Sequence, residues 1–310
     1  NIQPGPARWK TGHSQNLGAS GCARANPRRG AFSDRAGPRK ACFTAGMSVS
    51  HWRRQAAAHG LVRTPEVPRT ADLVVLGAGV AGVSAALEGE RQGLRVVVLE
   101  RHGVAAGASG RNAGFLMRGM AENYAVAIEQ YGRERARAAW RLSEENLKDL
   151  SALGVEELRS FQRVPSVLLA LEEKERAQLR ASVELLREDG FDALWVSEGA
   201  DAAWSSGIAM GGLVNPHDGA VNPIELLHWL ASKLRTPVVQ GVEAAEITPK
   251  GGGVVVRTSA GDVEAARVLV CTNAYAGEML ASLRGVVSPR RGQMLSVRLR
   301  GVEENPWRRL

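Results

Sequence analysis

Six consecutive residues, Gly77-Ala78-Gly79-Val80-Ala81-Gly82, have the glycine spacing that binds the pyrophosphate of a dinucleotide. In this pattern the first glycine permits a tight turn and the second lets the backbone approach the phosphates. The third lets a helix pack closely on a strand. Glu100 lies about 20 residues further on, where an acidic side chain can accept hydrogen bonds from a ribose diol. These residues predict a nucleotide-binding site.

The residues around this pattern predict a strand, a helix and a second strand. Residues 71–76 form a short apolar run typical of a buried parallel strand. A helical stretch then extends to about Gln92, with Gly93 as its C-cap, and the apolar run 94–99 ends at Glu100. Because strand, turn, helix, strand and terminal acid occur in this order, a dinucleotide site is favoured over an ordinary glycine-rich turn.

A second glycine-rich segment, residues 107–114, follows at once with the sequence GASGRNAG. Small residues let a backbone lie against a large flat ligand, and Ser109, Arg111 and Asn112 can hydrogen-bond phosphates or ring heteroatoms. A nicotinamide enzyme usually continues with another regular βα unit, so this segment favours FAD over NAD. A surface loop with a solvated arginine is the alternative interpretation.

With these residues in place, the sequence resembles the FAD-dependent oxidoreductases of the D-amino-acid oxidase superfamily. Within it, the sequence is most similar to the bacterial glycine/sarcosine oxidase and gamma-glutamylputrescine oxidoreductase branch. The resemblance spans about Asp72 to Arg300. Besides the two glycine segments, the residues that carry it are Glu100-Arg101, Asn222-Pro223, the run VLVCTNAY at 268–275 and the run PRRGQ at 289–293.

The resemblance implies an α/β fold in which an FAD-binding Rossmann-like domain of glutathione-reductase type is interleaved with an antiparallel-sheet substrate domain. The expected limits are 71–153 and 214–285 for the FAD-binding domain, and 154–213 and 286–310 for the substrate domain. Family members continue beyond a strand like the one predicted at 294–300. We therefore expect a substrate domain that is truncated at its C-terminal end, and a chain that is a fragment.

The resemblance also implies which residues bind FAD. In the family, a strand like the one at Val242 passes the adenine, and the segment after the strand ending near residue 270 returns to the cofactor. A simple helix cap at Asn273 is the alternative there. Arg111 stands where some members carry a covalently linked histidine, so non-covalent FAD is expected. The expected FAD-binding residues are Gly77, Gly79, Val80, Ala81, Gly82, Glu100, Arg101, Ala108, Ser109, Arg111, Asn112, Gly114, Val242, Thr272 and Asn273.

The activity that the resemblance implies is the oxidation of a small-molecule amine or amino acid. A hydride would pass from the carbon next to the nitrogen to flavin N5, and the imine would hydrolyse. Oxygen or an electron carrier would then take the electrons. Two alternatives stay open, an NAD(P)-dependent dehydrogenase and a non-catalytic flavoprotein-fold subunit. No catalytic residue can be assigned, since His228 is expected to pack on a helix and His217 lies in a turn.

The net positive charge of the chain comes from its first 70 residues. The whole chain carries +8, but residues 1–70 contain 12 Lys and Arg against only Asp34 and Glu66, so the rest is close to neutral. This leader also contains 6 of the 13 prolines and no sustained apolar periodicity, which predicts disorder. A nucleic-acid partner therefore has no support in the folded body.

Three origins fit this basic leader. We expect a start at Met47, with residues 1–46 as non-native read-through of upstream sequence; a transit peptide and a basic nucleic-acid arm are the alternatives. The expected location is cytoplasmic, or organellar if the leader is a transit peptide. The longest uncharged apolar stretch, 73–87, is too short for a transmembrane segment. Cys22, Cys42 and Cys271 predict neither a disulfide framework nor a metal site.

The remaining periodicity predicts alternating helices and strands. Asn222 is expected to cap a helix with Pro223 at its first position. Residues 194–207 predict a strand followed by a helical turn, and residues 211–219 predict an irregular, turn-like segment. The other expected helices are 122–153 and 172–189, and the other expected strands are 163–171, 237–240, 242–248, 253–258 and 263–270.

Overall fold

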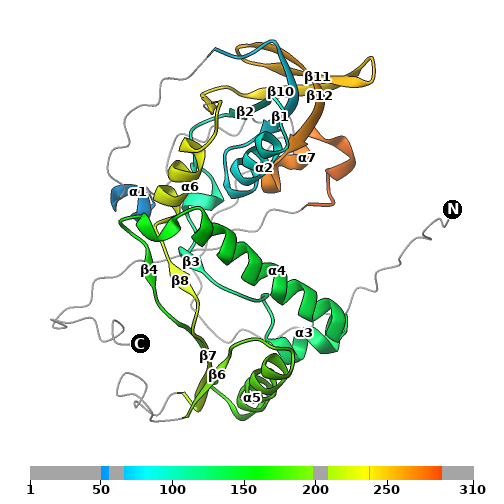
Figure 1. The fold of residues 1–310 in the computed structure, drawn as a ribbon. Coiled ribbons are helices and arrows are strands. Elements are labelled where there is room, and N and C mark those ends of the chain that lie inside the picture. The colour runs from blue at the N-terminus through cyan, green and yellow to red at the C-terminus, as the bar shows by residue number, and fades with distance from the viewer. Residues whose placement is uncertain (1–49, 56–65, 198–208, 237, 288–310) are drawn as a thin grey trace, which may run out of the picture. The chain divides into compact units, whose positions relative to one another are not determined.

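The computed structural model describes residues 50–55, 66–197, 209–236 and 238–287 of the chain. Within these ranges the strands form three sheets, with helices packed against them (Figure 1). The α-helices are α1 (His51–Gln55), α2 (Val80–Arg91), α3 (Tyr124–Tyr131), α4 (Arg133–Ala152), α5 (Glu173–Glu188), α6 (Pro223–Ser232) and α7 (Ala276–Met279). Short 3₁₀-helices are η1 (Ala108–Gly110), η2 (Val155–Glu157), η3 (Asn273–Tyr275) and η4 (Ala281–Leu283).

The largest sheet has six strands in the order β10-β11-β12-β1-β2-β9. Strands β12, β1, β2 and β9 are parallel to one another, and β10, β11 and β12 form an antiparallel meander. Its strands are β1 (Thr70–Leu76), β2 (Val96–Glu100), β9 (Val239–Gln240), β10 (Ala244–Lys250), β11 (Gly253–Thr258) and β12 (Gly261–Val270). The predicted strand–helix–strand unit is present as β1, α2 and β2.

Strand β1 lies in the middle of this sheet and is buried on both faces. On one face Val75 packs with α2 and α6 around Val83 and Leu227. On the other face Val74 and Leu76 pack with residues of β2, β9, β11 and β12. Successive side chains of a strand point to opposite faces, so a strand covered on both sides must be apolar throughout. This explains the apolar run at residues 73–76.

The two smaller sheets each have three strands. One has the order β3-β8-β4 and the other the order β5-β7-β6, and all their pairings are antiparallel. Their strands are β3 (Phe115–Leu116), β4 (Gln162–Arg163), β5 (Ser166–Leu169), β6 (Leu194–Ser197), β7 (Gly211–Asn215) and β8 (Gly219–Ala220).

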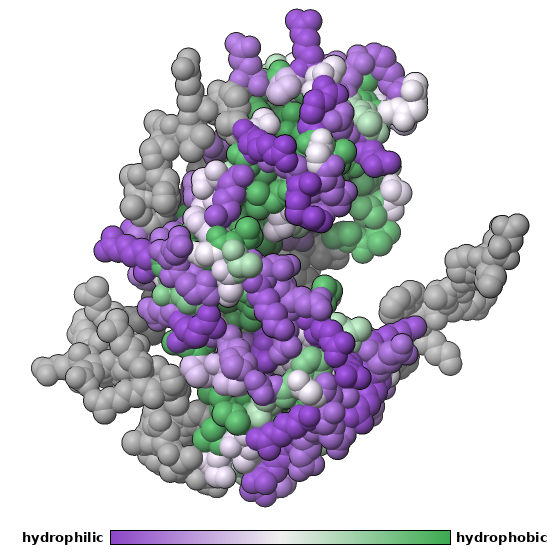
Figure 2. Space-filling model, viewed as in Figure 1, coloured by the Kyte–Doolittle hydropathy of each residue, from purple (hydrophilic) through white to green (hydrophobic). Residues whose placement is uncertain are grey.

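Helices α3, α4 and α5 share a core with the second small sheet. Tyr124, Trp140 and Phe191 form its aromatic centre, and the ring of Tyr124 makes edge contacts with both partners. The buried residues of α5 recur at helical spacing, at positions 179, 182, 183 and 186. The side of α5 that faces the viewer is mostly hydrophilic (Figure 2). The helix therefore presents one apolar stripe to the sheet.

Three predicted elements differ from the structure. The single strand expected at 163–171 is divided into β4 and β5, which belong to different sheets. The single helix expected over 122–153 is divided into α3 and α4 at Gly132, whose φ of +85° is a left-handed conformation that no α-helix continues through. Residues 211–219, expected to be irregular, contain the central strand β7, whose five residues are all buried. Its sequence, GGLVN, is poor in strand formers, and its pairing with β5 and β6 overrides that local preference.

The disorder predicted for the whole of residues 1–70 is also wrong in part. Residues 51–55 form helix α1, and β1 begins at Thr70. The sequence around α1 lacks apolar periodicity, but α1 lies beside α6, and Trp52 packs against the core that α2 and α6 share. Tertiary contacts thus order a segment that local pattern cannot identify. The read-through expected for residues 1–46 lies outside the described residues.

Several local predictions are confirmed. The Asn222 side chain accepts hydrogen bonds from the backbone N–H groups of Ile224 and Glu225, and Pro223 is the first residue of α6. Helix α2 ends at Arg91, close to the predicted end, but its C-cap is Gln92 and not Gly93, which follows with a φ of +84°. The strand predicted at 253–258 matches β11. The helical turn expected after β6 and the strand expected at 294–300 lie outside the described residues, and the domain limits stay a prediction.

The contact between α6 and α2 supplies a test of the core. Leu227 is 2% exposed and packs beneath β1 and α2. Replacing a buried leucine by alanine removes apolar contacts and leaves a cavity, so L227A is expected to lower the free energy of unfolding by about 2–5 kcal/mol. Urea denaturation measures the change. Leu142 on α4 is 67% exposed, and the matched control L142A is expected to shift stability by no more than about 0.5 kcal/mol.

Candidate functional site

The turn between β1 and α2 is built from backbone that approaches other backbone very closely. Gly77 has a φ of +104° and donates its N–H to the carbonyl of Leu99 at 2.8 Å. A Cβ at Gly77 would lie 2.9 Å from the carbonyl oxygen of Cys271, and a Cβ at Gly82 would overlap the carbonyl oxygen of Gly77. The two glycines therefore let α2 start directly against the ends of β1 and β12.

Gly79 ends this turn as the N-cap of α2. Its backbone is extended, and glycine has no side chain of its own to cap the helix. Val80 and Ala81, the first exposed residues of α2, follow it. The Val80 N–H donates to the Ser109 hydroxyl at 3.0 Å, and a Cβ on Gly79 would come within 2.9 Å of the same oxygen. The second glycine segment thus meets the first at the positive end of the helix dipole.

Glu100 is positioned by the turn itself. One carboxylate oxygen accepts from the Ala78 N–H and the other from the His102 N–H, each at 2.8 Å. These bonds fix the end of β2 against the Gly77–Gly82 turn. A carboxylate has about four acceptor positions. Two backbone bonds leave capacity for the two hydroxyls of a ribose, as the sequence pattern predicts.

The second glycine segment is held in shape by its own side chains. Ala108 begins the 3₁₀-helix η1. The Asn112 side chain donates to the Ser109 carbonyl at 2.9 Å and accepts from the Gly114 N–H at 2.8 Å. Arg111 is half-buried between them. Asn112 is therefore a structural residue of this loop, which defines where Ser109 and Arg111 lie.

Arg101 and Val242 lie at the edge of the same site. The Val242 N–H donates to the carbonyl of Glu100 at 3.1 Å, and the Val242 side chain is buried in the core of the sheet. Arg101 is 3.2 Å from Glu243 and lies over the ring of Tyr275, 5.7 Å from its centroid. This part of the sheet therefore offers backbone groups and a half-exposed guanidinium.

Thr272 and Asn273 reach the site from the other side of β1. The Cys271 N–H donates to the carbonyl of Leu76 at 2.9 Å, which places Thr272 just beyond the first glycine. The expected alternative, a helix cap at Asn273, is wrong, because Thr272 is the N-cap of η3 and Asn273 is its first residue, with a φ of +53°. The Thr272 hydroxyl is buried, and no described group forms a hydrogen bond with it. A buried hydroxyl in this position fits a polar ligand.

These groups all lie at the carboxyl ends of parallel strands. The glycine turn follows β1, Glu100 ends β2, and Thr272 follows β12. In open α/β sheets this edge is where nucleotides bind. The N-terminus of α2, the absence of a side chain at Gly79 and the buried hydroxyl of Thr272 fit the pyrophosphate and sugar of a dinucleotide. The structure thus brings together three segments that are far apart in the sequence.

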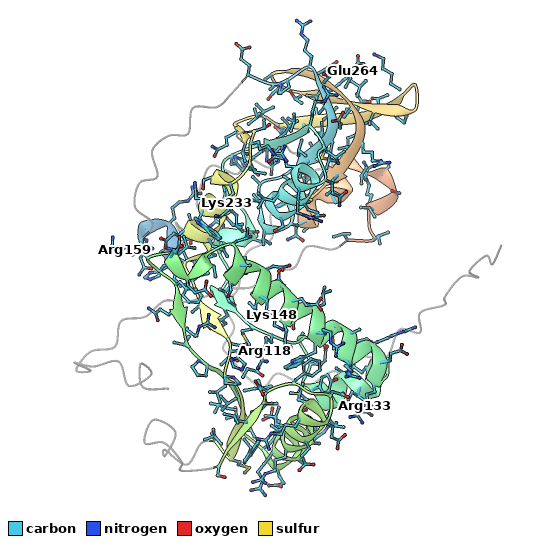
Figure 3. The ribbon with its side chains drawn as sticks, viewed as in Figure 1. Arg118, Arg133, Lys148, Arg159, Lys233 and Glu264 are labelled. Atoms are coloured by element: carbon cyan, nitrogen blue, oxygen red, sulfur yellow. The ribbon has the colours of Figure 1, made fainter. Side chains whose placement is uncertain are left out.

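A buried charged cluster beyond the second glycine segment was missed by the sequence reasoning. Arg118 lies between α4 and the strands β7 and β8 (Figure 3), with its side chain 2% exposed. It forms ion pairs with Glu144 and Asp218 and donates to the carbonyl of Asp192 at 2.8 Å. Burial raises the pKa of the Asp218 carboxyl. The only sign of this cluster in the sequence is an arginine, Arg118, next to the apolar run FLM at 115–117.

The two histidines differ in their surroundings. His217 is exposed and pairs with Asp192, with 2.8 Å between Nε2 and the carboxylate oxygen. This pair lowers the pKa of Asp192. His228 is a half-buried residue of α6, as expected from its apolar neighbours. Among the described residues no group of His, Cys, Asp and Glu could hold a metal ion. The described helices are also too short or too polar to cross a membrane.

Comparison with known proteins agrees with this geometry. Among curated proteins, the chain is 31% identical to the probable oxidoreductase OrdL of Haemophilus influenzae over 216 residues, which are 66% of this chain and 49% of that protein. It is 29% identical to gamma-glutamylputrescine oxidoreductase of Escherichia coli over 219 residues, which are 67% of this chain and 50% of that protein. The chain spans about half the length of these two relatives.

Solved structures show the same fold. Glycine oxidase from Geobacillus kaustophilus matches with a TM-score of 0.54 at 22% identity, over 68% of this chain and 58% of that one. The family model described as FAD dependent oxidoreductase, DAO, matches residues 72–309. This match includes both glycine segments, Glu100 and Thr272. The chain therefore belongs to the DAO family of FAD-dependent oxidoreductases.

Proposed function

We propose that this chain carries the FAD-binding part of an enzyme that oxidises an amine or an amino acid. The observation that carries the proposal is the meeting of the Gly77–Gly82 turn, Glu100, Ser109 and Thr272 at one edge of the parallel sheet. When bound, FAD would supply the two-electron acceptor for a hydride from the carbon next to the amine nitrogen, and oxygen or a carrier would accept the electrons in turn.

Different residues of the site would bind different parts of FAD. The N-terminus of α2, with Gly79, Val80 and Ala81, would bind the pyrophosphate, and Glu100 would accept from the ribose of the adenosine half. The backbone at Val242 and the guanidinium of Arg101 flank the adenine side. The side chains of Ser109, Arg111 and Thr272 would bind the flavin half. In this arrangement backbone groups and side chains both contribute to binding.

The substrate class rests on the relatives. One is named as an oxidoreductase of gamma-glutamylputrescine, an amine, and a solved structure with the same fold is a glycine oxidase. We propose a small amine or amino acid as the substrate of this protein as well. The described residues provide no assigned acid, base or substrate clamp, and the chain spans only about half of those relatives.

A visible spectrum tests both parts of the proposal. The purified chain is mixed with FAD, separated from free cofactor by gel filtration, and titrated without oxygen with a panel of amines and amino acids. We expect a retained flavin spectrum that one class of amine bleaches. If flavin is bound but no amine bleaches it, the proposed substrate class is contradicted and the proposed cofactor is retained. A colourless protein that binds NADH would instead support a nicotinamide-dependent dehydrogenase.

The second glycine of the turn supplies a test of the pyrophosphate site. A methyl group at Gly79 would meet the Ser109 hydroxyl and cover the backbone at the start of α2. G79A is therefore expected to weaken FAD binding about 10-fold or more, which corresponds to about 1.4 kcal/mol. The matched control is G107A in the second glycine segment, where a Cβ meets nothing within 4 Å. Equal FAD affinity in the two variants, measured by fluorescence quenching, would refute the assignment.

Glu100 supplies a test of the ribose contact. In E100Q the amide keeps the size of the side chain but has one acceptor oxygen, so the Ala78 and His102 N–H groups and the ribose compete for it. We expect FAD affinity to fall roughly 10- to 100-fold, since hydrogen bonds to charged groups contribute about 1.5–3 kcal/mol. Riboflavin has no adenosine ribose, so its weak binding should be the same in E100Q and the unaltered chain. A parallel loss of riboflavin binding would point to a damaged fold.

A further inference from the structure

The segment Ser50–Gln55 binds to the second glycine segment at two carbonyl groups. The Ser50 hydroxyl donates to the carbonyl of Gly110 at 2.8 Å. The indole N–H of Trp52 donates to the carbonyl of Asn112 at 2.7 Å. Arg111 lies between these two attachment points. Residues from outside the expected folded body therefore hold both sides of the peptide that carries Arg111.

The ring of Trp52 also covers Gly114. A Cβ on Gly114 would lie 3.1 Å from the indole Cζ2 and 2.5 Å from the carbonyl oxygen of Val221. Gly114 also has a φ of +76° and accepts a hydrogen bond from the Val221 N–H at 2.8 Å. The glycine is thus enclosed between the indole on one side and the Val221 backbone on the other. No side chain would fit there without moving Trp52 or the strand segment.

Helix α6 fixes the position of Trp52. The Asn222 side-chain nitrogen donates to the carbonyl of Trp52 at 3.2 Å, while the oxygen of the same side chain caps α6. Helix α1 lies beside α6 (Figure 1). Trp52 is therefore tied to an element that also packs on α2 and β1. The glycine segment is held against the core from two sides.

These contacts orient the peptide groups of the loop. In a trans peptide the C=O and the following N–H point in opposite directions. When Trp52 binds the carbonyl of Asn112, the N–H of Ala113 points away from Trp52. The carbonyl of Ser109 is already occupied by the Asn112 side chain. The carbonyl groups are thus bound by the chain itself, and they are kept from facing an electron-rich ligand.

We propose that Ser50 and Trp52 are positioning residues for FAD. They hold the carbonyls of Gly110 and Asn112 on the side away from the cofactor, so that Ser109, Arg111 and the Ala113 N–H face it. This inference rests on the proposed function. It assigns a task to two residues of the leader that precede the family match at residue 72.

The test uses the full chain with single substitutions. W52F keeps an aromatic ring but removes the N–H donor together with part of the indole surface that covers Gly114, and S50A removes only the hydroxyl donor. Each is expected to raise the dissociation constant for FAD roughly 5- to 20-fold, the effect of about one lost hydrogen bond. The visible circular dichroism of the bound flavin should also change, because Arg111 and Ser109 are no longer held. S50T keeps the hydroxyl, so its dissociation constant for FAD and its flavin dichroism should equal those of the unaltered chain.

Two controls separate positioning from general stability. W229F makes the same chemical change on α6, where Trp229 stacks with Lys233 4.3 Å from its ring centroid, and R53A alters an exposed residue of α1. Both should bind FAD like the unaltered chain. If S50A and W52F also keep the unaltered dissociation constant and flavin dichroism, the inference is overturned. If the unaltered chain binds no FAD at all, the proposed function is contradicted, and this inference, which rests on it, is contradicted as well.

Discussion

The close approach of α2 to the end of β1 is the constraint on which the nucleotide site depends. It requires that Gly77 and Gly82 carry no side chain, because a Cβ on either would run into backbone. Three other segments are then bonded to the same turn. Glu100 accepts from Ala78, the Ala105 N–H donates to the Ala78 carbonyl, and Cys271 bonds to Leu76. Most of these bonds involve main-chain atoms, so the geometry depends on few side chains.

The charged side chains on the two sides of the second glycine segment differ in their burial. Beyond it, Arg118 is buried and forms ion pairs with two carboxylates. Burying an unpaired charge is costly, so Glu144, Asp218 and Arg118 form a unit that joins α4 to the loop before β8. On the nucleotide side the charged groups Glu100, Arg101 and Arg111 are only partly buried. The charged groups of the Arg118 cluster are thus paired with one another inside the protein.

The sequence was sufficient where local chemistry decides the structure. The glycine turn, the buried strand β1 and the Asn222 cap each depend on residues a few positions apart, and the structure has all three. It was insufficient where distant contacts decide. Strand β7 has two glycines and gains its order from β5 and β6, and α1 gains its order from α6 and the second glycine segment. The Arg118 cluster joins positions that no local pattern relates.

The placement of β12 next to β1 has a consequence for how the protein is made. Leu76 lies opposite Val270, so the strand that completes the site leaves the ribosome long after the glycine turn has been synthesised. Until then, one edge of β1 has unpaired N–H and C=O groups, which can pair with other extended chains. Contacts between such distant segments also form slowly. The nascent chain therefore passes through a stage in which the nucleotide motif is present but the site is open on one side. Protection by a chaperone, or rapid completion of the sheet, has its greatest value at this stage.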